Sequence, residues 1–110
     1  MRFIDCYVHL DQEVNAQMAK HKYSEKKYTV YATIKAKGHI SETDLDAIET
    51  MVNSIDRLKS MTGLPGLPSA VAYEGGILRI CINGFNIKGK PNYKTAKTLM
   101  NGIITIVRTA

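Results

Sequence analysis

Residues 81–108, CINGFNIKGKPNYKTAKTLMNGIITIVR, hold the strand, loop and helix around which the rest of the chain is organised. An apolar strand leads into a basic loop rich in Gly, Pro and Asn, and that loop leads into the last helix. Asn92 follows Pro91 and is predicted to be the N-cap of this helix, because Asn favours that position. The helix is predicted from about Tyr93, because apolar residues recur at helical spacing: Ala96, Leu99, Met100, Ile103 and Val107.

The start of this helix is a candidate site for an anion, because a helix N-terminus offers unpaired N–H groups and a partial positive charge. Phe85 offers a ring on which a base could stack, and four lysines surround the loop: Lys88, Lys90, Lys94 and Lys97. An ordinary strand–loop–helix connection with solvated lysines has the same pattern. Pattern alone favours that simpler interpretation.

Strands are predicted in four segments. Residues 27–37 alternate strictly and are predicted to turn five side chains toward the core: Tyr28, Val30, Ala32, Ile34 and Ala36. Residues 69–84 form a predicted hairpin that turns at Gly75-Gly76, with Leu78, Ile80 and Ile82 facing the core. Residues 2–10 are predicted to place Ile4, Cys6, Val8 and Leu10 on one face and Phe3, Asp5, Tyr7 and His9 on the other. Residues 11–26 are predicted to be a long connection.

Another helix is predicted to begin at a Ser41 cap and to stop at Gly63, with an apolar stripe formed by Leu45, Ile48, Val52, Ile55 and Leu58. The predicted fold class is therefore α+β, in the order β-β-α-β-β-α. An antiparallel sheet of about four strands has both helices packed on one face. Residues 1–110 form a single ligand-binding domain. Since one face and the edges of the sheet stay open, self-association is expected.

Composition sets limits on function. The chain has 110 residues, 45% hydrophobic and 23% charged, which is typical of one globular domain. A net charge of +5 favours anionic partners, but the lysines are too scattered for a nucleic-acid arm. No secretory signal or membrane-spanning run is found, and Cys6 and Cys81 are predicted to be buried free thiols. These features indicate a cytoplasmic protein.

Catalytic and metal sites are not favoured. His9, His21 and His39 fall on different predicted elements, and no Cys or His pair has the spacing of a zinc site. Strand alternation separates Cys6 from Asp5 and His9, so a nucleophile with its base is not expected. We therefore expect no catalytic residues, no metal ion and no cofactor.

Single-stranded nucleic acid is the alternative ligand. Tyr31, Lys27, Lys35 and Lys37 share one strand face, which resembles a stacking platform with basic edges. A solvated sheet face is the simpler explanation of the same residues.

Two arginines are candidates for phosphate binding. Arg57 lies late in the first predicted helix beside its apolar stripe, and Arg108 lies near the end of the last helix. An arginine fork on a rigid helix can bind phosphate through paired hydrogen bonds. Arginines at such positions more often pack along the core, pair with an acid or complement the helix C-terminus.

The whole chain resembles the phage-encoded Thoeris anti-defence proteins of the first type, which act as signal sponges. The resemblance rests on the layout: an N-terminal strand region, a helix ending near Arg57, a hairpin, and a C-terminal helix begun by Asn92. It implies tight binding, without degradation, of the cyclic ADP-ribose isomer made by bacterial TIR-domain enzymes. It also implies a homo-oligomer whose pockets involve both subunits: family members assemble as dimers, and some form hexamers that hold cyclic dinucleotides in additional sites.

The same resemblance implies the site residues. Arg57 resembles the family's pocket arginine on the first helix, Asn92 its asparagine at the start of the last helix, and Arg108 its C-terminal arginine. The family stacks an aromatic ring on adenine, and here Phe85 is the nearest candidate, since the neighbouring strand positions hold Ile80 and Ile82. A sponge acting in the cytoplasm of an infected bacterial host needs neither a general base nor a metal.

Overall fold

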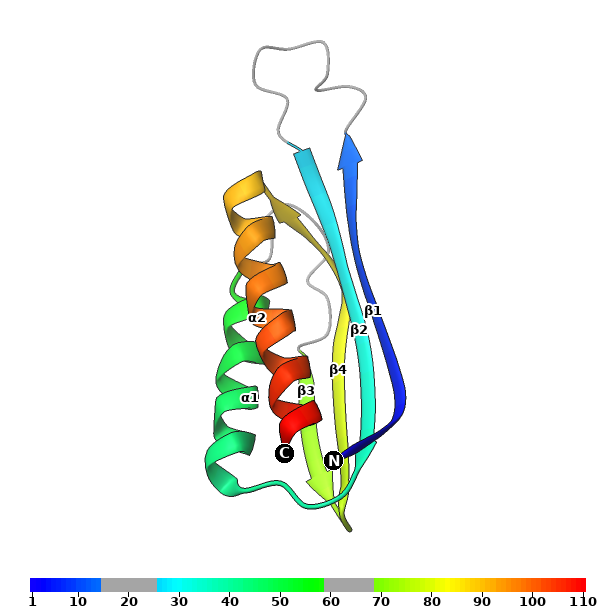
Figure 1. Cartoon of the computed structure of the whole chain (residues 1–110). Coiled ribbons are helices and arrows are strands. Elements are labelled where there is room, and N and C mark those ends of the chain that lie inside the picture. Colours follow the sequence, from blue (N-terminus) through cyan, green and yellow to red (C-terminus); the bar gives the residue numbers. More distant parts are fainter. Residues whose placement is uncertain (15–25, 59–68) are drawn as a thin grey trace.

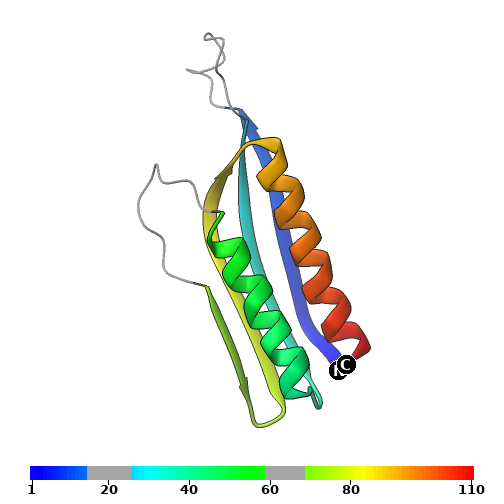
Figure 2. The same ribbon diagram turned by 90° about the vertical axis from the view of Figure 1, so that its left-hand side faces the viewer.

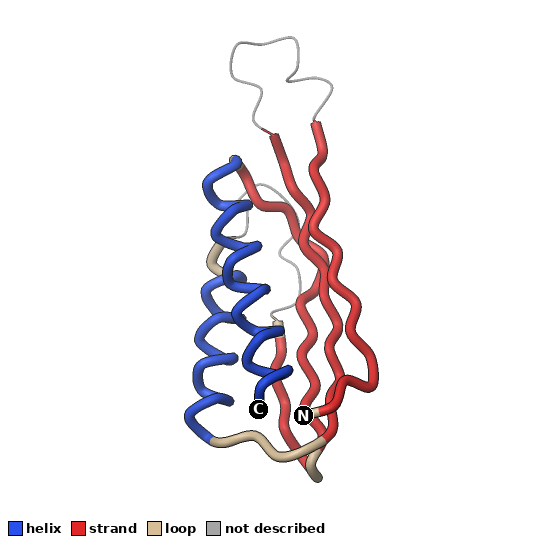
Figure 3. Tube along the Cα trace, in the orientation of Figure 1, coloured by secondary structure: helices blue, strands red, loops and turns tan. Residues whose placement is uncertain are grey.

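Two helices and four strands make up the computed structural model, which describes residues 1–14, 26–58 and 69–110 (Figures 1 and 3). Their order along the chain is β-β-α-β-β-α, as predicted. The elements are β1 (Arg2–Val14), β2 (Lys26–Lys37), α1 (Glu42–Asp56), β3 (Ala70–Glu74), β4 (Ile77–Lys88) and α2 (Lys90–Thr109).

The strands form one antiparallel sheet in the order β1-β2-β4-β3. Both helices cover the same face, so the molecule has two layers (Figure 2). This confirms the predicted α+β fold class. β1 and β3 are the edge strands. The predicted connection over residues 11–26 is too long, because β1 continues to Val14 and β2 begins at Lys26. Residues 15–25, which join them, lie outside the described residues.

The core lies between the sheet and the helices. All five predicted inward residues of β2 are at most 2% exposed, and the predicted Leu78, Ile80 and Ile82 of β4 are buried with them. Alternation explains this result, because every second residue of a strand faces the same side. The helices contribute their apolar stripes, whose buried members are Ile48, Val52, Ile55, Ala96, Met100, Ile103 and Val107.

A β-bulge changes the predicted faces of β1. The register with β2 shifts between Phe3 and Asp5, so one extra residue, Ile4, interrupts the alternation. Phe3 therefore packs against the core, whereas Ile4 is 49% exposed, and the prediction for these two residues was wrong. The prediction that Cys6 is buried was also wrong: this thiol is exposed, because it lies on an edge strand.

A second bulge lies between β2 and β4. Val30 pairs with Phe85 and Ala32 pairs with Ile82, so Tyr31 faces two residues of β4 rather than one. A bulge of this kind bends the strands, and β4 stays paired with β2 as far as Lys88, next to the start of α2 (Figure 1).

Helix α1 begins as predicted, and the Ser41 side chain accepts a hydrogen bond of 3.2 Å from the Asp44 backbone N–H. Its predicted end at Gly63 was wrong, because the helix ends at Asp56 with Arg57 as its C-cap. Gly63 lies outside the described residues.

Gly38 follows the last residue of β2, at the end of the sheet where the β3–β4 hairpin turns. Its φ of 145° is one that glycine adopts readily. Its N–H donates to the Gly76 carbonyl at 2.9 Å, and its own carbonyl accepts from the Tyr73 hydroxyl at 2.8 Å. A β-carbon at this position would lie 3.2 Å from the Met1 Cα. Gly38 thus connects β2, the β3–β4 hairpin and the start of the chain.

Candidate ligand-binding site

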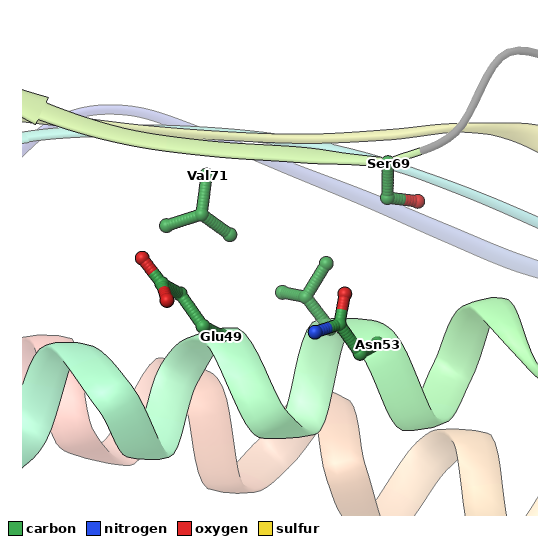
Figure 4. A pocket seen from close by; sticks show the side chains of 5 residues that line it. Glu49, Asn53, Ser69 and Val71 are labelled. Carbon is green, nitrogen blue, oxygen red and sulfur yellow. The ribbon is translucent and has the colours of Figure 1, made fainter.

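A groove between α1 and β3 is the candidate site (Figure 4). Glu49 and Asn53 of α1 point across it toward Val71 of β3 and Ser69, and Val52 completes the lining. Its volume is about 190 Å³. The groove is therefore mainly polar on its helical side and apolar at Val71.

Hydrogen bonds fix one end of this groove. The Ser69 hydroxyl donates to Asp56 Oδ1 at 2.8 Å, and the Ser69 backbone N–H lies 3.4 Å from Asp56 Oδ2. These contacts connect the last residue of α1 to the residue before β3. Because they join two elements across the groove, they hold its walls at a constant separation.

Arg57 follows this end of α1. Its backbone N–H donates to the Asn53 carbonyl at 3.1 Å, and its side chain is exposed. Glu49, Asn53 and Arg57 are spaced by four residues and follow one side of the helix. Within residues 1–14, 26–58 and 69–110, no acidic side chain forms an ion pair with Arg57; His9 and Asp11 do form one, at 3.7 Å. The arginine is therefore an exposed cation one helical turn beyond Asn53, and it does not itself line the groove.

Asn92 is not the N-cap of α2, which corrects the prediction. The helix begins at Lys90 and its N-cap is Gly89, whose φ of 85° turns the chain out of β4 two residues before Pro91. Asn92 lies in the first turn, is exposed, and donates from Nδ2 to the Lys88 carbonyl at 3.0 Å. Its side-chain amide therefore holds the corner between β4 and α2.

The four lysines around this corner are Lys88, Lys90, Lys94 and Lys97, which we name the basic corner; the last three are exposed. The corner also contains an aromatic pair that the sequence analysis missed. Tyr93 stacks on the buried Tyr28 with centroids 4.0 Å apart, and Lys97 Nζ lies 5.7 Å from the Tyr93 centroid. The stack of Tyr93 on Tyr28 fastens α2 to β2, and it occupies one face of the Tyr93 ring.

Phe85, the predicted stacking residue, lies in β4, where its backbone pairs with Val30. Its ring lies outside the described part of the structure.

Arg108 lies in the last turn of α2 and is exposed. The two helices run antiparallel, so Arg57 and Arg108 lie toward opposite ends of the helix layer (Figure 1). Met51 of α1 faces Gly102 of α2, and each arginine lies six residues farther along its own helix, so Arg57 and Arg108 are separated by about 18 Å along the helix axes. The two arginines are therefore not brought together within one chain, whereas Asn92, in the first turn of α2, lies at the same end of the helix layer as Arg57.

The groove residues carry different amounts of sequence signal. The four-residue spacing of Glu49, Asn53 and Arg57 along one side of α1 is visible in the sequence. Of these three, only Arg57 was predicted as a site residue. Ser69 and Val71 carry no such signal, because their place opposite α1 depends on how the sheet packs against the helix.

In residues 1–14, 26–58 and 69–110, no three His, Cys, Asp or Glu side chains lie close enough together to hold a metal ion. No helix in the described part of the chain is both long enough and apolar enough to cross a membrane. Comparison with protein families, with curated proteins and with solved structures finds no match to this chain.

Proposed function

We propose that this protein is a phage anti-defence sponge that binds a TIR-derived cyclic ADP-ribose isomer and holds it without degrading it. It acts as a homo-oligomer in the cytoplasm of the infected bacterial host and takes cyclic dinucleotides as candidate second ligands. The proposal comes from the resemblance of the whole chain to the first type of Thoeris anti-defence proteins.

The observation that carries it is the polar groove at Glu49 and Asn53, with the exposed Arg57 four residues beyond Asn53 at the end of α1. A cyclic ADP-ribose isomer contains a pyrophosphate, two riboses and a purine. The Arg57 guanidinium suits the pyrophosphate, because it donates several hydrogen bonds in a fixed plane. The Glu49 carboxylate and the Asn53 amide suit neutral groups, such as ribose hydroxyls or the adenine amino group. Charge therefore orients the ligand, with its phosphates at Arg57 and away from Glu49.

The size of the groove supports a site shared between copies. Pockets for small ligands usually measure about 300–1,000 Å³, and this groove measures about 190 Å³. A groove of this volume on one chain therefore encloses only part of a cyclic ADP-ribose isomer. A second copy would supply the remaining contacts, and Arg108 is a candidate residue, since it is exposed at the opposite end of the helix layer from Arg57. Asn92 is exposed at the same end as Arg57 and is a candidate contact from either copy.

The test is calorimetric titration of the purified full chain with the TIR-derived cyclic ADP-ribose isomer, followed by heating and chromatography of the released ligand. We expect tight binding and recovery of the ligand intact. Arg57→Ala should weaken binding by about tenfold to a hundredfold, because a hydrogen bond to a charged group contributes about 1.5–3 kcal/mol. Arg2→Ala is the matched control, since Arg2 is an exposed arginine on β1. The Arg2→Ala variant should bind the ligand as tightly as the wild type does.

Recovery of an altered ligand would assign the protein to the enzymes instead. Failure to bind would reject the sponge, and the alternative, a small basic nucleic-acid-binding or regulatory protein, would be tested next. That alternative draws on the exposed Tyr31 beside Lys35 and Lys37; the side chain of Lys27 lies outside the described residues. It predicts polynucleotide affinity that falls steeply with rising salt concentration.

A further inference from the structure

The edge strand β3 lies between two cavities, one on each face of the sheet. The groove at Val71 opens on the helix side, beside α1, and has a volume of about 190 Å³. The second cavity lies on the sheet face opposite the helices, named here the open face, and has a volume of about 340 Å³. We name this second cavity the hollow; it is lined by Ala72, Glu74, Ile77 and Arg79. Because neighbouring residues of a strand point to opposite faces, Val71 and Ala72 reach one cavity each.

The outer edge of β3 has no partner strand in the described part of the chain. On its inner side, β3 forms a hairpin with β4 through the two-residue turn at Gly75-Gly76. In a two-residue hairpin the residues that flank the turn bond to each other, and inward and outward backbone groups alternate from there. Val71 and Tyr73 therefore turn their N–H and C=O groups outward. Backbone groups in such a row can pair with an added strand.

The two edges of the sheet differ in their protection against such pairing. β1 is interrupted by the bulge at Ile4 and carries the exposed acids Asp5 and Asp11. β3 pairs with β4 in unbroken register and contains no lysine or proline. Natural sheets use lysines, prolines and bulges to block added strands, and β3 has only its short length of five residues. The partner that suits this edge is therefore a short extended segment.

We propose that the edge of β3 binds an extended peptide segment of another protein as an added antiparallel strand. Paired residues of neighbouring strands point to the same face of a sheet. The peptide residue opposite Val71 therefore enters the groove, and the residue opposite Ala72 enters the hollow. Backbone bonds to Val71 and Tyr73 provide affinity, and the two cavities, which take adjacent side chains of the peptide, provide specificity.

The groove favours a lysine or arginine of the peptide. Val52 and Val71 give the groove apolar walls, and the Glu49 side chain points across it toward β3 (Figure 4). Within the described residues Glu49 forms no ion pair. A long basic side chain can lay its methylene stem along the valines and bring its charge to the Glu49 carboxylate. The groove is also smaller than the usual ligand pocket of about 300–1,000 Å³, so it suits one side chain.

The hollow favours an aromatic side chain. Ala72 has a small, exposed side chain, so a ring from the neighbouring strand can lie over it and against Ile77. Because Glu74 and Arg79 line the hollow together, a charged side chain of either sign would meet a like charge there. A ring carries no charge, and the Arg79 guanidinium can cover its face. In an antiparallel strand the residue opposite Ala72 precedes the residue opposite Val71, so the recognised order is aromatic and then basic.

This partner goes beyond the proposed function, because a peptide rather than a nucleotide occupies the edge of β3. The two ligands share Glu49 on the helical wall of the groove, so each should exclude the other. The hollow lies on the other face of the sheet and is not part of the proposed nucleotide site. Substitutions in the hollow therefore separate the two proposals.

Fluorescence anisotropy of a labelled synthetic peptide, titrated with the full chain without nucleotide, tests this inference. The probe is Ser-Thr-Val-Tyr-Lys-Thr-Ser, whose tyrosine and lysine stand opposite Ala72 and Val71. We expect saturable binding, and exchanging the tyrosine and the lysine should weaken it at least about tenfold. N-methylation of the peptide lysine should have an effect of the same size, because its N–H bonds to the Val71 carbonyl. N-methylation of the peptide tyrosine is the matched control, since that N–H points away from β3.

Variants of the protein test the two cavities separately. Glu49→Lys should weaken peptide binding at least about tenfold, because it repels the peptide lysine. Ala72→Arg, which fills the hollow, should weaken peptide binding by a similar factor and leave nucleotide binding unchanged. Thr98→Arg adds the same side chain at an exposed position of α2 and should bind the peptide as tightly as the wild type does.

Circular dichroism of each variant establishes that it is folded. No saturable binding by the wild-type chain up to about 1 mM would overturn the inference, as would equal binding of the exchanged peptide. Binding that survives N-methylation of the peptide lysine would also overturn it, because no strand would then be added. If Ala72→Arg changed the mass of the protein in sedimentation but not its peptide binding, the edge would belong to a second copy instead. Peptide binding without nucleotide binding rejects the sponge alone, and the reverse result rejects the peptide site alone.

Discussion

The two faces of the sheet differ in what they bury. The face under the helices is uniformly apolar, and all its inward residues on β2 are at most 2% exposed. The open face mixes tyrosines, small residues and charges of both signs, and its side chains keep part of their surface in water. Neighbouring residues of one strand, such as Thr33 and Ile34, belong to these different environments. The difference shows that burial against the helices determines which residues one side accepts, whereas the other side tolerates polar and charged residues.

The largest effect is expected from Ile34→Ala. Ile34 is buried and pairs with Ile80 across β2 and β4, so truncation leaves a cavity and costs about 2–5 kcal/mol of unfolding free energy. Thr33→Ala, one residue away on the open face, should change it by at most about 0.5 kcal/mol. Urea unfolding at one fixed protomer concentration measures both, since association also contributes to stability. Equal costs for the two variants would contradict the distinction between the faces.

A smaller but clear loss of unfolding free energy is expected from Gly38→Ala, in the connection between β2 and α1. The positive φ of Gly38 and the 3.2 Å approach to the Met1 Cα both oppose a β-carbon. The neighbour is backbone, which moves less readily than a side-chain tip, so the cost should be about 1–3 kcal/mol. Thermal unfolding measures it. Gly84→Ala is the control, because its position has no atom near an added β-carbon and no positive φ.

Much of the fold could be predicted from the sequence because the governing signals are local. Alternation in β2 identified every inward residue, the Gly75-Gly76 turn fixed the hairpin, and Ser41 capped α1 as expected. The predictions failed where a single residue changes the strand alternation or the start of a helix. Ile4 adds a residue to β1 and reverses the faces before it. Gly89 starts α2 earlier than Asn92 suggests.

The candidate site was less predictable than the fold. Arg57 was identified from its place at the edge of an apolar stripe, and the groove beside it requires that α1 pack against β3. Arg108 lies at the opposite end of the helix layer from Arg57, because α2 is antiparallel to α1, and Asn92 is on α2 rather than on the elements that line the groove. Spacing along a sequence carries no information on which residues a second copy contributes. The contribution of Asn92, Arg108 and Phe85 to ligand binding stays a prediction.

The smallest effect is expected within the covered face, at Gly102 of α2. A β-carbon there would lie 3.0 Å from the Met51 Sδ and 3.1 Å from its Cε, so Gly102 lets the two helices approach closely. Ala is favoured over Gly in a helix by about 1 kcal/mol, and the Met51 tip is flexible enough to move aside. These effects oppose each other, and Gly102→Ala should change the unfolding free energy by less than about 1 kcal/mol. Gly102→Leu, measured by the same urea titration, should be clearly destabilising, because the larger side chain cannot be accommodated by the tip alone. If Leu were tolerated as well as Ala, the helices would not be in close contact at this level, and the covered face would be packed more loosely than its buried residues indicate.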